Sequence, residues 1–97
     1  MRVISQDGTI DVPYEDFVFS ILNSGNGNYG IVAVKNVAEP PEVFTNSLIA
    51  TYSTKAKAIK AMEMLREAWV NGTVEFEDGI YHRNIVFQFP QDDEIEV

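Results

Sequence analysis

The stretch Ile49–Gly72, IATYSTKAKAIKAMEMLREAWVNG, decides the fold, because a strand-like segment runs directly into a long amphipathic pattern. Ser53 or Thr54 is a good N-cap, and Asn71-Gly72 is typical of a left-handed C-cap. At about 100° per residue, one apolar stripe collects Ala58, Ala61, Met62, Leu65, Ala68 and Trp69. Opposite it fall Lys60, Glu63 and Glu67. The pattern predicts a helix over 54–70 that packs on a sheet.

The segments around this helix have the composition of strands. Runs rich in β-branched and aromatic residues cover 2–5, 10–12, 17–22, 31–35 and 48–52. Asp7-Gly8 is a strong hairpin signal between the first two. After the helix, 73–79 is an acidic connection or a short strand. The last strand is expected at 80–81 and 85–89.

The length of 97 residues allows one modest core and is too short for two. We therefore expect one α+β domain over 1–90, followed by a mobile acidic tail at 91–97. Its architecture should be an antiparallel meander sheet of about five to six strands, with the amphipathic helix packed on one face.

Composition excludes several classes of function. The chain has no cysteine, which excludes disulfides, thiolate metal sites and a cysteine nucleophile. No apolar run approaches the roughly 18 residues of a membrane span, and the opening MRVIS lacks the features of a signal peptide. The net charge of −8 repels nucleic acids and anionic membranes. We expect a cytoplasmic protein that binds neither directly.

The segment Gly25–Gly30, GNGNYG, matches the G-x-G-x-x-G pattern of dinucleotide-binding loops. That function requires a helix immediately after the loop, whereas a strand-like IVAVK follows here. We interpret the segment as a glycine-rich hairpin that can still serve as a binding loop, with Tyr29 as its anchor.

A basic cluster marks the beginning of the predicted helix. Lys55, Lys57 and Lys60 lie in its first two turns, while the chain outside 53–66 carries fourteen acidic and three basic residues. Helix N-termini bind anions through free N–H groups, and lysines add to that attraction. The functional interpretation is an anion site built by Ser53, Thr54, Lys55, Lys57 and Lys60. The alternative is a solvated lysine face paired with acids from nearby loops.

Other polar residues give weaker signals. His82 is the only histidine and has no cysteine beside it, so a metal site of the usual type has little support. Arg83 beside it could line a polar pocket. The acidic clusters at 75–78 and 92–96 lack calcium-loop spacing, and no nucleophile–base pair can be assembled. We therefore expect no enzyme activity, no metal and no cofactor.

Three stretches of the chain resemble small phage and prophage proteins of Firmicutes: MRVISQDGTIDVPYE, IATYSTKAKAIKAMEMLREAW and NIVFQFPQDDE. The resemblance covers both ends and the helix, and it implies a setting in a bacterial host cell rather than an activity. Small phage proteins of this kind are often counter-defence factors. Some sequester a nucleotide immune signal, and others are acidic inhibitors of a nuclease such as Cas9.

Three hypotheses follow for the function. The first is a counter-defence binding protein that sequesters an anionic small molecule of the nucleotide type. The second is an acidic protein–protein inhibitor, anti-CRISPR-like, that binds a basic host protein by mimicking nucleic-acid charge. The third is a structural or regulatory phage component that forms a homo-oligomer through an exposed strand edge.

Overall fold

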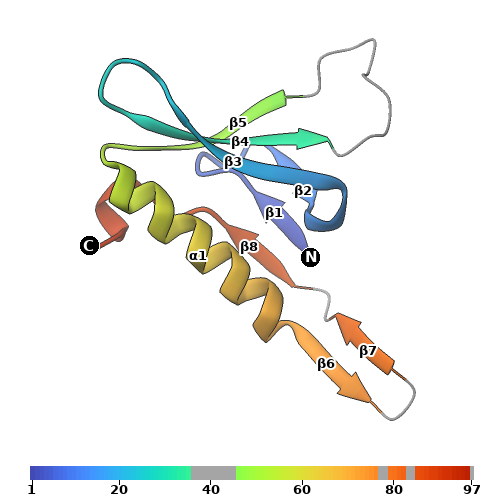
Figure 1. Ribbon diagram of the computed structural model, residues 1–97. Coiled ribbons are helices and arrows are strands. Elements are labelled where there is room, and N and C mark those ends of the chain that lie inside the picture. The colour runs from blue at the N-terminus through green and yellow to red at the C-terminus, as the bar shows by residue number, and fades with distance from the viewer. Residues whose placement is uncertain (36–45, 77–78, 83–84, 97) are drawn as a thin grey trace.

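The computed structural model describes residues 1–35, 46–76, 79–82 and 85–96. In chain order its elements are β1 (Arg2–Ile4), β2 (Asp11–Pro13), the short 3-10 helix η1 (Tyr14–Asp16), β3 (Phe17–Asn23), β4 (Tyr29–Lys35), β5 (Asn46–Tyr52), α1 (Lys55–Asn71), β6 (Thr73–Phe76), β7 (Gly79–His82), β8 (Val86–Gln88) and the 3-10 helix η2 (Asp92–Glu94). In Figure 1 the long helix α1 runs among the strands. The predicted α+β class is confirmed.

The strands do not form the single antiparallel meander that the sequence predicts. Within the described residues they form two three-stranded sheets, with orders β2-β1-β8 and β3-β4-β5, and a β6-β7 pair. The last predicted strand is divided, since β7 pairs with β6 while β8 runs parallel to β1. A parallel pair needs a long crossover connection, and the chain between β1 and β8 supplies it. Strand order of this kind depends on contacts distant in sequence, which local patterns do not encode.

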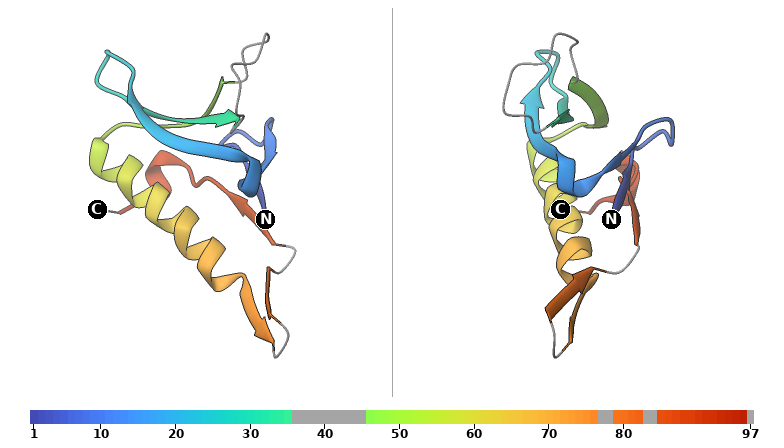
Figure 2. Two further views of the ribbon diagram at one scale, coloured as in Figure 1. Left: turned by 45° about the vertical axis from the view of Figure 1, so that its right-hand side comes forward. Right: turned by 90° about the vertical axis from the view of Figure 1, so that its right-hand side faces the viewer.

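The core lies where three layers meet. The β3-β4-β5 sheet lies above α1, and the β2-β1-β8 sheet lies beside the helix (Figures 1 and 2). Each layer contributes buried apolar side chains, and α1 packs chiefly against β4 and β5. The buried core comprises Val3, Val12, Ile31, Ala33, Ile49, Ala50, Tyr52, Ala58, Ala61, Leu65, Phe89 and Ile95.

The helix matches the predicted stripe and differs at its end. Ala58, Ala61 and Leu65 are buried, and the partly buried Trp69 stacks on Tyr14 with 4.6 Å between ring centroids. The following Gly72 has φ of −82° and is right-handed, so the predicted left-handed cap is wrong. A Cβ at Gly72 would lie 2.5 Å from Ile85 Cδ1 and 3.2 Å from the Ala68 carbonyl oxygen, so a larger residue there would require Ile85 to shift.

The glycine-rich segment forms the turn between β3 and β4. Gly25 and Gly27 have φ values of 86° and 89°, which glycine adopts without strain. Strand β4 begins at Tyr29, and no helix follows the loop. The hairpin interpretation is therefore confirmed, and the loop lacks the helix that a dinucleotide fingerprint needs.

Candidate functional site

The turn after β1, the end of β5 and the chain after β8 meet at one place, and Gln6 holds them together. Its side chain accepts a hydrogen bond from the Thr51 N–H at 3.0 Å and donates to the carbonyls of Thr51 and Pro90, both at 3.1 Å. Its backbone N–H donates to the Ile49 carbonyl at 2.8 Å. The Gln91 amide donates to the Gln6 carbonyl at 2.6 Å. This network fixes the C-terminal chain beside the junction of β5 and α1.

Tyr52 is buried at this junction and bonds to the chain after β8. Its side chain is fully buried, and its hydroxyl donates to the Pro90 carbonyl at 2.8 Å. Burial raises the pKa of Tyr52, and the negative charges of Asp92 and Glu94 raise it further. The hydroxyl therefore stays protonated and acts as a hydrogen-bond donor at neutral pH.

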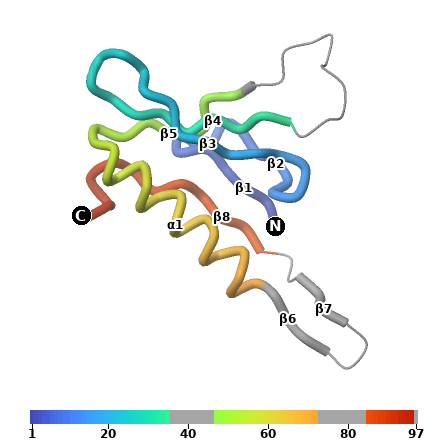
Figure 3. Tube along the Cα trace, in the orientation of Figure 1, coloured from blue at the N-terminus to red at the C-terminus, as the bar shows by residue number. Residues whose placement is uncertain are grey.

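The C-terminal segment, defined here as residues 91–96, turns back to the N-terminal end of α1 (Figure 3). Ile95 is 5% exposed and belongs to the core. The backbone carbonyl of Gln91 accepts a hydrogen bond from the N–H of Glu94 at 3.0 Å, while the Glu94 carboxylate accepts from the Gln91 N–H at 2.8 Å. Acidic residues that the sequence assigns to a tail thus lie against the domain.

Four residues form the helix-start cluster: Ser53, Thr54, Lys57 and Asp92. The carboxylate of Asp92 accepts from the Ser53 N–H at 2.7 Å and from the Ser53 hydroxyl at 3.0 Å. The ammonium group of Lys57 donates to the Asp92 carboxylate at 3.2 Å and to its carbonyl at 3.0 Å. Thr54 caps the helix, since its hydroxyl accepts from the Lys57 N–H at 3.2 Å. The predicted anion site therefore already holds an anion, which belongs to the same chain.

The electrostatics of the cluster favour that charge. Hydrogen bonding from the Ser53 N–H is the largest cause that lowers the pKa of Asp92, and Lys57 lowers it further. Partial desolvation opposes these effects, and the net shift is downward. The Lys57 side chain is 22% exposed and the Asp92 side chain 40%, so solvent only partly screens the pair.

The structure brings some of the predicted site residues together and separates others. Lys60 faces Glu63 of the same helix at 3.9 Å, with both side chains nearly half exposed. Lys57 pairs with Asp92 of the C-terminal segment, which is the kind of pair that the alternative of lysines paired with acids from nearby loops expects. Lys55 is exposed on the first turn. Tyr29 lies opposite Tyr52 in the sheet and packs on the core. Arg83 lies outside the described residues.

Sequence reasoning missed Asp92 and Gln6. A signal for Asp92 did exist, because an acidic segment and a basic helix start in one chain attract each other. Nothing local pairs these partners, since Ser53 and Asp92 are 39 residues apart. Gln6 sits in a segment that reads as an ordinary hairpin turn.

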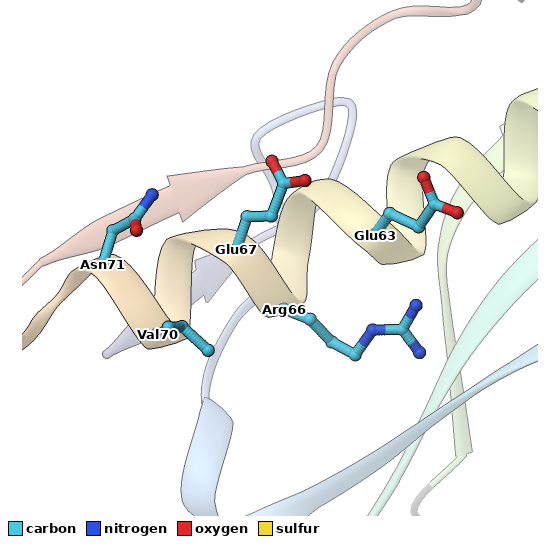
Figure 4. Close-up of a pocket in the computed structure, with 5 residues that line it drawn as sticks. All are labelled: Glu63, Arg66, Glu67, Val70 and Asn71. Atoms are coloured by element: carbon cyan, nitrogen blue, oxygen red, sulfur yellow. The ribbon is translucent and has the colours of Figure 1, made fainter.

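A hollow of about 490 Å³ lies over the C-terminal half of α1, away from this cluster. Its described lining consists of Glu63, Arg66, Glu67, Val70 and Asn71. Figure 4 shows that Glu67 and Asn71 point to one side of the helix, whereas Arg66 and Val70 point to the other. Ligand sites instead have polar groups that converge on one point, which favours the helix-start cluster over this hollow.

Two further properties concern the described residues as a set. No three acidic, histidine or cysteine side chains among them are grouped closely enough to hold a metal ion. None of the helices formed by them has the length and hydropathy of a membrane span.

Comparison with protein-family models, curated proteins and solved structures finds no match to this chain.

Proposed function

We propose that this chain is a non-catalytic binding protein that captures an anionic ligand of the nucleotide type at the helix-start cluster. The observation that carries the proposal is the Asp92 carboxylate, which accepts hydrogen bonds from the Ser53 N–H, the Ser53 hydroxyl and Lys57. Phosphate oxygens accept from the same kinds of donor. The exposed Lys55 adds positive charge beside these donors, and Lys60, which faces Glu63 at 3.9 Å, lies further along the same helix.

A ligand that uses these donors must first displace Asp92. A group tethered in the same chain competes at an effective concentration on the order of millimolar. A single phosphate group offers few more hydrogen-bond acceptors and little more charge than the Asp92 carboxylate that it would replace. A diphosphate or dinucleotide offers more oxygens and can engage Lys55 and Lys60 as well as Lys57. The proposed ligand class is therefore a nucleotide with two or more phosphate charges.

The proposed setting is the cytoplasm of a bacterial host cell that carries a phage or prophage, where the protein would sequester a nucleotide immune signal. Support comes from the resemblance to phage proteins. Its three stretches contain Gln6, Ser53 and Asp92, which belong to the segments that meet beside the helix start. Sequestration needs tight binding and no chemistry, which agrees with a site made of hydrogen-bond donors and lysines.

Calorimetry with a panel of ADP-ribose, cyclic ADP-ribose and cyclic dinucleotides tests this proposal. The wild-type chain should bind at least one member, and Lys57→Glu should weaken that binding about tenfold or more by removing a donor and adding repulsion. Lys35→Glu, which makes the same charge change at an exposed position on β4, is the matched control and should bind as wild type does. Absence of heat with every member, in both wild type and Asp92→Ala, would refute the proposal.

The second candidate function is an acidic inhibitor of a basic host protein. The observation that favours it is the exposure of Asp93, Glu94 and Glu96, which the C-terminal segment displays on the surface while Asp92 is engaged. Neutralising these three to Asn and Gln should abolish a salt-sensitive association with a basic nuclease. The same variant should leave nucleotide binding intact, which separates the two candidates.

A further inference from the structure

The two edges of the β3-β4-β5 sheet differ. The outer edge of β5 is occupied, because the Gln6 side chain bonds to Thr51 and the Gln6 N–H bonds to the Ile49 carbonyl. β5 also carries a bulge. β3 has no bulge, and no described residue bonds to its outer edge as Gln6 does to that of β5. In the described part of the chain β3 pairs with β4 alone.

The backbone groups on the outer edge of β3 follow from the register. Directly opposed residues in an antiparallel pair alternate between hydrogen-bonded and non-bonded pairs. Ser24 donates to the Asn28 carbonyl at 3.1 Å, and Leu22 is opposite Gly30, so both pairs are of the bonded type. The groups that point away from β4 are therefore those of Phe17, Phe19, Ile21 and Asn23.

The contacts of β5 independently give the same assignment of the residues whose backbone groups point outward. Thr51 and Ile49 direct their backbone groups outward to Gln6. Tyr52, the neighbour of Thr51, must then face β4, where it is opposite Tyr29. Gly30, the next residue along β4, consequently faces β3, as the assignment requires. No described residue hydrogen-bonds to the outward groups of β3.

The side chains of β3 also leave this edge open to pairing. Natural sheets protect free edges with charges, prolines or bulges. The sequence FVFSILN has no charge and no proline, in a chain with 15 acidic and 7 basic residues. Val18 and Leu22 are 53% and 55% exposed on one face, while Phe19 and Ile21 are half-buried on the other.

We propose that β3 is the interface of a homodimer in which two copies pair edge to edge, antiparallel, about a two-fold axis at Ser20. In this register Phe19 is opposite Ile21 of the second copy, and Phe17 is opposite its Asn23. These are the residues with outward backbone groups, so each such pair exchanges two N–H···O bonds. Val18 packs against Leu22 of the second copy on the exposed face.

The distribution of charge around β3 favours a second copy of this chain as the partner at this edge. The acids next to β3 are Glu15 and Asp16, at its N-terminal end. Two-fold pairing brings that end beside the turn 24–28 of the second copy, which has no ionisable residue. As far as the described residues are concerned, two chains of net charge −8 can therefore meet here without placing acids against each other. This interface does not depend on the proposed function.

Sedimentation velocity and light scattering test the interface. Because one strand edge is small beside the roughly 800 Å² per partner of stable complexes, we expect a dimer at concentrations on the order of 10–100 μM. Raising salt from ~50 mM to ~500 mM should strengthen it by screening the repulsion between the chains. A wild-type chain that stays monomeric throughout overturns the proposal.

Two variants with the same charge change locate the contact. Ser20→Lys places two lysines opposite each other at the axis and should give a monomer. Leu48→Lys, on the exposed face of β5 two strands away, should leave the dimer intact. Far-ultraviolet circular dichroism checks that both fold. A Ser20→Lys dimer, or equal loss of dimer in Leu48→Lys, would contradict edge pairing.

Hydrogen exchange gives a second measurement on the same question. The amides of Phe19 and Ile21 should exchange slowly in wild type at dimer-forming concentration, and at least tenfold faster in Ser20→Lys. Leu22, which faces β4, should stay protected in both. Fast exchange at Phe19 and Ile21 in a wild-type dimer would place the interface elsewhere.

Discussion

The Asp92 carboxylate lies 2.7 Å from the backbone nitrogen of Ser53, immediately before the helix cap Thr54. A chain segment that is distant in sequence thereby supplies the negative charge that the positive end of a helix dipole favours. Lys57 holds the same carboxylate from the first turn of the helix. One residue of the C-terminal segment thus satisfies donors that are otherwise available to a ligand.

Asp92→Ala should remove the contact between the C-terminal segment and the helix start, while Gln91 and Ile95 still anchor the segment. Without the carboxylate, the Ser53 N–H loses its acceptor, so its amide should exchange about tenfold or more faster in hydrogen-exchange NMR. Asp93→Ala removes a neighbouring exposed acid and is the control. Equal exchange of Ser53 in wild type and Asp92→Ala would show that the contact is absent in solution.

Thr54→Ala should destabilise the domain by about 1 kcal/mol, the usual cost of losing an N-cap. For a chain of this size that corresponds to a fall in Tm of about 4–8 °C. Thr54→Ser retains the hydroxyl that accepts from Lys57 N–H, so it should behave much as wild type in a thermal melt. If the serine and alanine variants lose the same stability, capping is not the role of Thr54.

Gln6→Ala should lower the free energy of unfolding by about 1–3 kcal/mol, because it leaves the Thr51 N–H and two carbonyls without their partner. Urea denaturation measures the change. Gln88→Ala is the matched control, because the Gln88 amide makes one long bond of 3.3 Å to the Ser5 carbonyl. A loss in Gln6→Ala no larger than in Gln88→Ala would contradict the linking role of Gln6.

Acidification should weaken the turn between β1 and β2 by protonating the Asp7 carboxylate. Hydrogen bonds from the hydroxyls of Thr9 and Ser5 lower the pKa of Asp7 from 3.8 to about 2. Because the folded pKa lies below the unfolded one, this stabilisation is complete above about pH 4 and is lost as the pH falls towards 2. Asp7→Asn should therefore show a shallower loss of stability between pH 4 and pH 2 in urea melts. Parallel pH profiles would exclude this contribution.

The sequence predicts those parts of the fold that depend on neighbouring residues. The helix follows from the spacing of Ala58, Ala61 and Leu65, and Thr54 is one of the two N-caps that the sequence offers. The turn at Gly25–Gly30 follows from its glycines. The strand-like composition of 17–22 likewise predicts β3. Each of these depends on propensity and periodicity, which act over a few residues.

The sequence does not predict the parts that depend on distant contacts. The parallel pairing of Val3 with Phe87 joins the two ends of the chain, and no local pattern specifies it. The same holds for Asp92, because the sequence shows its negative charge but does not show that it lies beside Ser53. Gly72 shows the limit at a single residue, since its backbone is right-handed and it packs against Ile85, a contact that the local pattern does not indicate.

The most direct measurement of the central claim is the affinity of the panel nucleotide that wild type binds, compared by calorimetry between wild type and Asp92→Ala under one buffer condition. If Asp92 occupies the ligand's place, removing it frees the Ser53 and Lys57 donors, and affinity should rise about tenfold or more. Equal affinity, or weaker binding by Asp92→Ala, would contradict the claim that the carboxylate and the ligand share one site.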